Sequence, residues 1–204
     1  MSIYLIRHGE TALNAAHVIQ PADTPLSERG RAQAAAVAQR MLAIGLAGIL
    51  SSDLPRARQT AQAIADVTGL AVIEDASLRE RNFGALRGKP IAELGRNLAT
   101  IEEAPPDGES AAQFRSRAAR AFAVMIEARR RIGGPLAVVS HGLVIRAVVE
   151  ELAPRAPDTP LPMHLVNTAV SVLAAEAPHT VSLAYCGSHL QGLAAGDARG
   201  RDGA

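Results

Sequence analysis

Short apolar runs alternate with helical patterns along most of this chain, and that alternation restricts the fold more than any other feature. A short apolar run bounded by turn residues indicates a buried strand, whereas apolar residues three and four positions apart indicate an amphipathic helix. The expected strands cover residues 2–6, 47–52, 71–73, 135–140, 169–174 and 181–185. Strands that alternate with helices predict a three-layer α/β/α sandwich with a mostly parallel central sheet.

Capping residues bound the helical patterns between these runs. Ser27 suits the N-cap of a helix that ends near Gly45, and Pro55 suits the first turn of the next helix. The helices are expected over residues 27–45, 55–69, 111–131 and 143–152, with a short helix after Pro90 and a loop over 78–86. Nothing in this order of elements indicates a second-domain boundary.

The length of the chain fits one domain. It has 204 residues, and a domain commonly contains about 100–200. We therefore expect a single domain over residues 1–194, followed by a tail rich in Gly, Arg and Asp, 195–204, that is disordered. The sequence leaves the oligomeric state open.

Charge and composition limit the partners and the compartment. A formal net charge of +1 argues against non-specific nucleic-acid binding. The single cysteine, Cys186, excludes an internal disulfide and fits a reducing compartment. The first apolar run is interrupted at Arg7, too early for a signal peptide, and no stretch approaches the roughly 20 apolar residues of a membrane span. We expect a soluble, cytoplasmic protein with no nucleic-acid or membrane partner.

Two of the apolar runs end in the same dipeptide, His-Gly. The first leads into Arg7-His8-Gly9, and the run over 135–140 leads into His141-Gly142. Either histidine alone would ordinarily be a solvated loop residue or a core residue. Ligands of open α/β sheets, however, gather at the carboxyl ends of strands, where both histidines and Ser52-Asp53 can converge. An arginine fork suits phosphate oxygens, and an imidazole can be a nucleophile or proton carrier near neutral pH.

Further motifs follow in order along the chain. They are Arg-His-Gly-Glu-Thr at 7–11 with Asn14, Asp-x-Pro-Leu-x-x-x-Gly at 23–30, Ser-Asp-Leu-x-Arg-Ala-x-x-Thr-Ala at 52–61, Leu-x-Glu-x-x-Phe-Gly at 78–84, Gly-Glu-Ser at 108–110, and Asn167 with His189-Leu190. From residue 3 to about 190, the chain resembles the histidine phosphatase superfamily in its phosphoglycerate-mutase-like branch. The resemblance implies that fold and a phosphohistidine mechanism.

The resemblance also implies catalytic roles. His8 would attack phosphorus in line and become phosphohistidine, and Glu80 would protonate the leaving alkoxide and later activate water. Arg7 and Arg56 would hold the phosphoryl oxygens, with His141, if protonated, as a third cation. Attack requires a neutral imidazole, so the other ring nitrogen of His8 needs a hydrogen-bond acceptor. The Gly9 carbonyl is the candidate.

The remaining candidates bind substrate rather than react with it. They are Asn14, Gln20 and the backbone amides of Gly142 and Leu143. Two of the catalytic assignments have alternatives. Arg58 competes with Arg56 for the site, and Glu80 could instead form a structural ion pair with the arginines that flank it.

Three functions fit this pattern. The first is hydrolysis of a small phosphate monoester without a metal or other cofactor, with inorganic phosphate as product. The second is a 2,3-bisphosphoglycerate-dependent phosphoglycerate mutase, and the third is a non-catalytic module that binds a phospho-ligand. Residues 88–110 carry Lys89 and Arg96 against five acidic residues, so this lid is expected to repel a second anion and to favour the phosphatase. The substrate stays open because Gln20-Pro21 and Arg87 depart from the family pattern.

Overall fold

A six-stranded sheet forms the centre of the computed structural model, which describes residues 2–95, 98–191 and 193. The strands are β1 (Ser2–Arg7), β2 (Gly48–Ser51), β3 (Val72–Glu74), β4 (Leu136–Ser140), β5 (Val170–Ala174) and β6 (Val181–Cys186), in the spatial order β3-β2-β4-β1-β5-β6. Neighbours from β3 to β1 are parallel, whereas β5 is antiparallel to β1 and to β6. The α/β prediction is confirmed, and the sheet is mixed. β5 and β6 pair in antiparallel fashion because the link between them is too short for a crossover.

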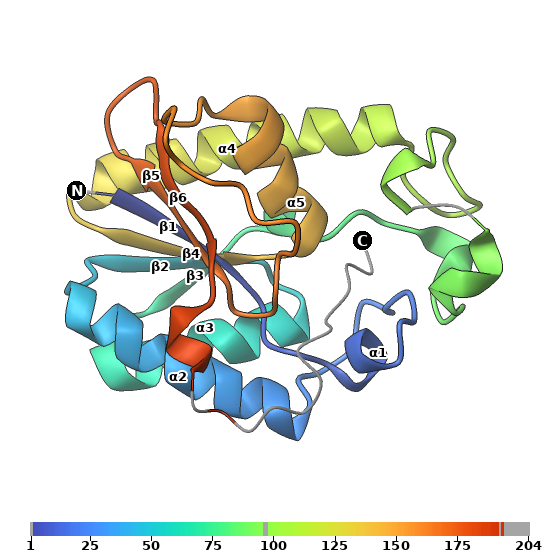
Figure 1. The fold of residues 1–204 in the computed structure, drawn as a ribbon, viewed down its shortest axis with the longest axis horizontal. Helices are drawn as coiled ribbons and strands as arrows, with labels where there is room; N and C mark the ends of the chain where they lie inside the picture. Colours follow the sequence, from blue (N-terminus) through green and yellow to red (C-terminus); the bar gives the residue numbers. More distant parts are fainter. Residues whose placement is uncertain (1, 96–97, 192, 194–204) are drawn as a thin grey trace.

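Helices cover both faces of the sheet, as Figure 1 shows. They are α1 (Ala12–Ala15), α2 (Glu28–Ile44), α3 (Pro55–Thr68), α4 (Ala111–Ile132) and α5 (Gly142–Arg146), which continues as a π-helical segment (Ala147–Leu152). Short 3₁₀ segments lie at Ala76–Leu78, Gly84–Leu86, Ile91–Leu94, Leu98–Thr100 and Ser188–Leu190. Helices α2 and α3 lie on one face, and α4 and α5 lie on the other. The three-layer architecture therefore follows the sequence prediction.

Each face of the sheet has its own apolar cluster because successive strand residues point to opposite sides. Ile3 and Leu5 of β1 belong to the cluster that includes α4, whereas Ile6 belongs to the cluster with α2 and α3. All three side chains are fully buried. Burial on both faces holds β1 in the middle of the sheet, with Arg7 opposite Ser140 at the carboxyl end.

The ends of α2 lie where the capping residues predict them, and the structure adds one short helix, α1. The Ser27 hydroxyl oxygen accepts a hydrogen bond from an amide of the first turn of α2, and the helix stops at Gly45, whose φ of 71° suits glycine. Helix α1 was not predicted. It has four residues, too few for a periodic pattern, and depends on Thr11, whose side chain caps the amide of Asn14 at 3.0 Å.

Two segments far apart in sequence lie side by side beyond the carboxyl ends of the strands (Figure 1). The amide of Gly88 donates to the carbonyl of Ile19 at 2.7 Å, and the amide of Ile19 donates to the carbonyl of Lys89 at 3.0 Å. The amide of Ile91 completes the contact by donating to the carbonyl of His17 at 2.9 Å. These bonds bring the residues after α1 and the loop after Gly84 to one rim.

The expected tail, 195–204, lies outside the described residues, and the single-domain assignment stays a prediction. Within the part of the chain that the structure describes, every helix is too short or too polar to cross a membrane.

Candidate active site

The two His-Gly segments meet because β1 and β4 are parallel neighbours. Arg7 pairs with Ser140 in the register, so His8 and His141 follow at adjacent positions. Their ring centroids lie 5.1 Å apart with an interplanar angle of 55°, and both side chains are buried. The convergence expected at the carboxyl ends of the strands is therefore found.

One ring nitrogen of His8 is held by its own loop. Its Nδ1 lies 2.7 Å from the Gly9 carbonyl oxygen, which can only accept, so Nδ1 carries the proton and Nε2 has the free lone pair. This contact is the one predicted for Gly9. The amide of Gly9 donates to the hydroxyl of Thr60 at 3.0 Å, and a Cβ at Gly9 would lie 2.5 Å from the Gly30 carbonyl oxygen. Only glycine fits this loop without moving the backbone.

Both histidines are neutral at neutral pH in this structure. Burial, followed by the charges of Arg56 and Arg7, holds the pKa of His8 well below its usual value. Burial and the same arginines, with His8, lower the pKa of His141 in the same way. The neutral state that nucleophilic attack needs is therefore present at His8. Burial beside two guanidinium groups disfavours a third cation at His141, the role considered from the sequence.

One ring nitrogen of His141 has a hydrogen-bond partner, and the other is buried without one. Its Nε2 lies 2.9 Å from the hydroxyl oxygen of Ser52, which also accepts from the amide of Leu54 at 3.3 Å. The hydroxyl proton is free to point at Nε2, and in that arrangement the proton of the ring lies on Nδ1. Nδ1 is buried and has no hydrogen-bond partner among the described residues. An orphaned buried donor costs about 1–3 kcal/mol, and a bound ligand oxygen would relieve it.

Two buried guanidinium groups flank the histidines. Arg7 donates to the Leu165 carbonyl, and Arg56 donates to the carbonyls of Pro21 and Ala22 at 3.3 and 3.5 Å. Burial lowers the pKa of Arg56 to about 10, so it stays charged at neutral pH. Two like charges held in a desolvated site attract an anion between them.

Arg58, the alternative to Arg56, lies outside the site. Its guanidinium pairs with Glu74 at 2.7 Å, and its side chain is 58% exposed. Arg56, by contrast, lines the cavity that contains His8.

Glu80 lines the same cavity. Its two carboxylate oxygens accept from the amides of Arg81 at 2.9 Å and of Leu143 at 3.2 Å. Within the described part of the chain, Glu80 forms no structural ion pair, because Arg79 pairs with Asp53 and the Arg81 guanidinium donates to backbone carbonyls.

The expected substrate-binding residues occupy different positions. Gln20 lines the cavity, and its amide oxygen accepts from the Thr11 hydroxyl at 2.8 Å. Asn14 is engaged in the loop instead, since its amide oxygen accepts from Thr11 and Asn167 at 3.3 Å each. The Leu143 amide, expected to face phosphate, instead donates to a carboxylate oxygen of Glu80. Gly142 is buried directly after His141, where α5 begins.

Two further residues contribute to the site, one of them missed from the sequence. Arg117 on α4 donates to the Glu80 carbonyl at 3.2 Å and pairs with Glu109 at 2.7 Å, so this pair holds the loop that carries Glu80. Arg87 lies at the mouth of the cavity. The sequence singled out Arg87 only as a departure from the family pattern. Arg117 was missed because the Gly-Glu-Ser motif at 108–110 does not indicate which residue Glu109 contacts. Among the described residues, no three His, Cys, Asp or Glu side chains are grouped so that they could hold a metal ion.

Several solved structures share this arrangement of strands and helices. Bacillus stearothermophilus YhfR matches with a TM-score of 0.77 and 28% identity, over 93% of this chain and 99% of that one. A phosphoglycerate mutase from Bacillus anthracis str. Sterne matches with a TM-score of 0.71 and 27% identity, over 85% and 87%. A mycobacterial glucosyl-3-phosphoglycerate phosphatase in complex with VO3 gives 0.70 and 29%, over 85% and 90%. The molecule thus has a phosphoglycerate-mutase-like α/β fold.

Sequence comparison is more specific than the fold. The model of the histidine phosphatase superfamily (branch 1) matches residues 3–186. A protein of Yersinia enterocolitica named "Probable phosphoglycerate mutase GpmB" is 36% identical over 181 residues, which are 84% of this chain and 83% of that protein. Its namesake in Yersinia pestis (strain Pestoides F) is 39% identical over 166 residues, 74% of each protein. The chain belongs to the histidine phosphatase superfamily, as its motifs indicate.

Proposed function

We propose that this protein is a phosphatase that hydrolyses a small phosphate monoester through a phosphohistidine on His8. The observation that carries the proposal is the free Nε2 of a neutral His8, in a cavity that Arg7 and Arg56 also line, with His141 and its unpaired Nδ1 close by at a ring-centroid distance of 5.1 Å. A nucleophile with a lone pair and donors for a dianion are what phosphoryl transfer requires. Solved relatives of this family hold VO3 or inorganic phosphate.

The first step transfers the phosphoryl group to the enzyme. Arg7, Arg56 and the Nδ1 proton of His141 bind the phosphoryl oxygens, and the lone pair of His8 Nε2 attacks phosphorus. The N–P bond forms as the P–O bond to the leaving group breaks. Glu80 acts as the general acid that gives a proton to the leaving oxygen, a contribution of about 10²–10⁴ in rate. The Gly9 carbonyl stabilises the positive ring of the phosphohistidine through Nδ1.

The second step regenerates the enzyme. The Glu80 carboxylate accepts a proton from water, and the water oxygen attacks phosphorus. The N–P bond breaks, inorganic phosphate leaves, and His8 returns to its neutral state. No metal or other cofactor enters either step. Each well-placed charge donor is worth about 10²–10³ in rate.

A phosphoglycerate mutase is the second candidate, and the names of the Yersinia relatives favour it. The acidic lid is weaker evidence against it than the sequence suggested. Glu102 pairs with Arg115 at 3.1 Å and Glu109 pairs with Arg117 at 2.7 Å, so two of the lid acids are neutralised. Incubation with 3-phosphoglycerate and 2,3-bisphosphoglycerate separates the candidates, because a mutase yields 2-phosphoglycerate and a phosphatase yields inorganic phosphate.

Hydrolysis of p-nitrophenyl phosphate tests the proposal directly. We expect turnover by the wild type, acid-labile phosphohistidine in quenched samples, and neither in His8→Ala. Steady turnover by His8→Ala would refute the nucleophile, and a silent but phosphate-binding wild type would indicate the non-catalytic module. We place the activity in the cytoplasm, where a free Cys186 thiol would persist.

A further inference from the structure

An open groove of about 920 Å³ adjoins the cavity that contains His8. Its walls are the 76–82 segment and the N-terminal half of α4, and Glu80 and Arg87 line both the groove and the cavity. Volumes of this size are typical of small-molecule sites. A phosphate ester held at His8 would therefore extend its alcohol portion into this groove.

The charges on the groove are unevenly compensated. Arg79 pairs with Asp53, and Arg117 pairs with Glu109. Arg87 and Arg120 also line the groove, are exposed, and have no carboxylate partner among the described residues. The groove thus carries two uncompensated cations, against the single carboxylate of Glu80 at its inner end.

Arg120 lines the groove but not the cavity that contains His8, whereas Arg87 lines both. Arg117 and Arg120 are three residues apart on α4 and so share a face, about 4.5 Å apart along the axis. Arg117 already reaches the Glu80 carbonyl, at 3.2 Å. Arg120 is thus placed for a group at the far end of the alcohol, whereas Arg87 serves the cavity mouth.

We infer that this groove selects phosphate esters whose alcohol portion is hydroxylated and carries its own anion, with Arg120 as the residue that binds that anion. The inference deepens the proposed function, because it concerns the leaving group of the same reaction. The Ser116 hydroxyl and the Gln113 amide also line the groove and offer neutral polar contacts to hydroxyl groups. The anion can be a carboxylate or a second phosphate, because a guanidinium forms charge-assisted hydrogen bonds with either group.

Binding to the inactive His8→Ala variant tests the inference without relying on turnover. The probes are linear six-carbon phosphates matched except at one end: sorbitol 6-phosphate, 6-phosphogluconate and sorbitol 1,6-bisphosphate. We expect the two probes that carry a second anionic group, 6-phosphogluconate and sorbitol 1,6-bisphosphate, to bind about tenfold more tightly than sorbitol 6-phosphate in calorimetry. This corresponds to a difference of about 1.4 kcal/mol in binding free energy. This preference should shrink as ionic strength rises.

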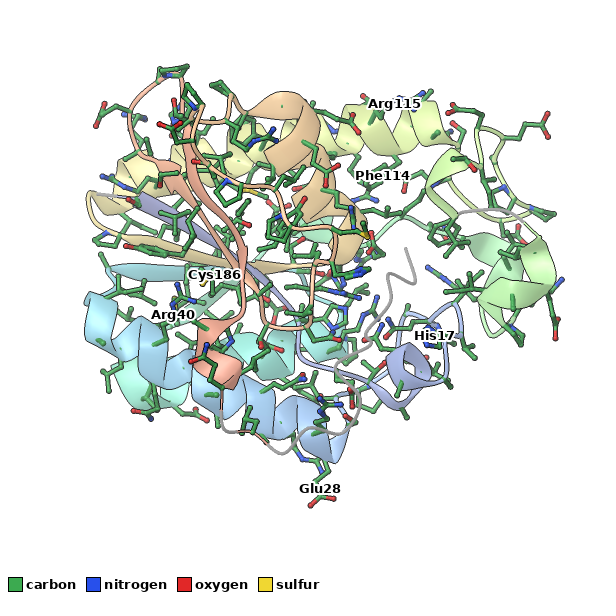
Figure 2. The ribbon with its side chains drawn as sticks, viewed as in Figure 1. His17, Glu28, Arg40, Phe114, Arg115 and Cys186 are labelled. Carbon is green, nitrogen blue, oxygen red and sulfur yellow. The ribbon has the colours of Figure 1, made fainter. Side chains whose placement is uncertain are left out.

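Three further substitutions, made in the same background, assign the effect. Arg120→Gln should abolish the preference without changing the affinity for sorbitol 6-phosphate, and Arg120→Lys should keep part of it. Arg115→Gln is the matched control. It removes the same charge from α4, but Arg115 lies on the outer side of the helix, opposite Phe114 (Figure 2), and pairs with Glu102.

The outcomes separate the inference from the proposed function. Equal affinity for all three probes, a preference that survives Arg120→Gln, an equal loss with Arg115→Gln, or no binding of any probe would overturn the inference. An Arg120-dependent preference in a protein whose wild type never releases phosphate would support the groove and refute the phosphatase. Hydrolysis by the wild type without any preference for the second anion would support the phosphatase and refute the role of the groove.

Discussion

Replacing Arg117 with methionine removes the contacts that hold the Glu80 loop against α4. The guanidinium donates to the carboxylate of Glu109 at 2.9 and 2.7 Å and to the carbonyls of Ser77, Arg79 and Glu80 at 2.8, 2.6 and 3.2 Å. Both members of the ion pair have side chains that are only 15% exposed. The variant therefore leaves Glu109 largely buried without its counter-charge.

The expected loss of stability follows from that burial. Removing one partner of a buried ion pair costs about 3–5 kcal/mol. We expect the lower end, about 3 kcal/mol in the free energy of unfolding, because Glu109 keeps some solvent and still accepts from the Asn82 amide at 3.2 Å. Urea denaturation measures this loss. The double substitution Arg117→Met with Glu109→Leu should recover part of it, since no buried charge remains.

The kinetic consequence should depend on the leaving group. Glu80 is needed to protonate an alkoxide but not a p-nitrophenolate, so a displaced Glu80 slows phosphohistidine formation only from alkyl phosphates. For Arg117→Met we expect a loss of about 10²-fold with an alkyl phosphate, the lower end of what general acid catalysis contributes, and less than about threefold with p-nitrophenyl phosphate. Rapid-quench measurement of the acid-labile phosphoenzyme gives both rates.

Three comparisons decide whether this reasoning holds. Glu80→Gln should show the same dependence on the leaving group, and the double variant should regain stability without regaining the alkyl rate. Arg115→Met, whose ion pair with Glu102 is exposed, should change neither quantity appreciably. A destabilised Arg117→Met that transfers alkyl and aryl phosphates at wild-type rates would refute the positioning role of Arg117.

Other consequences of the geometry can be measured separately. Because the folded protein holds the pKa values of His8 and His141 well below 6.5, the unfolded chain binds more protons and stability falls as pH drops below 6.5. Urea unfolding at pH 6.5 and 5.5 should differ by about 1 kcal/mol per histidine, and a flat profile would contradict the neutral pair. Ser52→Ala frees the Nε2 of His141 and should weaken inorganic phosphate binding about tenfold in calorimetry, with the fold retained. Gly30→Ala would place a Cβ 1.9 Å from the Glu10 carbonyl oxygen, so we expect at least ~3 kcal/mol of destabilisation by urea denaturation, and a near-normal midpoint would contradict the close packing.

The sequence predicts the centre of the site better than its supports. His8 and His141 could be brought together in advance because each follows an apolar run and parallel strands end at the same edge. The Gly9 contact is local, between neighbouring residues, and was also predictable. Arg117 lies 37 residues from Glu80 on a helix with several arginines, and no periodicity distinguishes it from the others.

Contacts between distant segments also changed two expectations. The Leu143 amide faces Glu80 because the loop after β3 crosses the start of α5, a packing that no local pattern contains. Counting charges along 88–110 ignored α4, whose Arg115 and Arg117 neutralise two of the acids. Charge composition of a segment predicts its field only when the partners from other elements are known.

The groove also bears on whether the phosphoenzyme gives its phosphoryl group to water or to a bound phosphoglycerate. A 2,3-bisphosphoglycerate-dependent mutase must retain the bisphosphorylated intermediate while it turns within the site, so the second anion has to be bound tightly enough that the intermediate does not dissociate first. An exposed guanidinium such as Arg120, which would contribute about tenfold in affinity, gives only a modest increase in residence time. The acceptor would then leave before transfer, and water would reach the phosphohistidine beside Glu80. The same anion contact that selects the substrate would still permit hydrolysis.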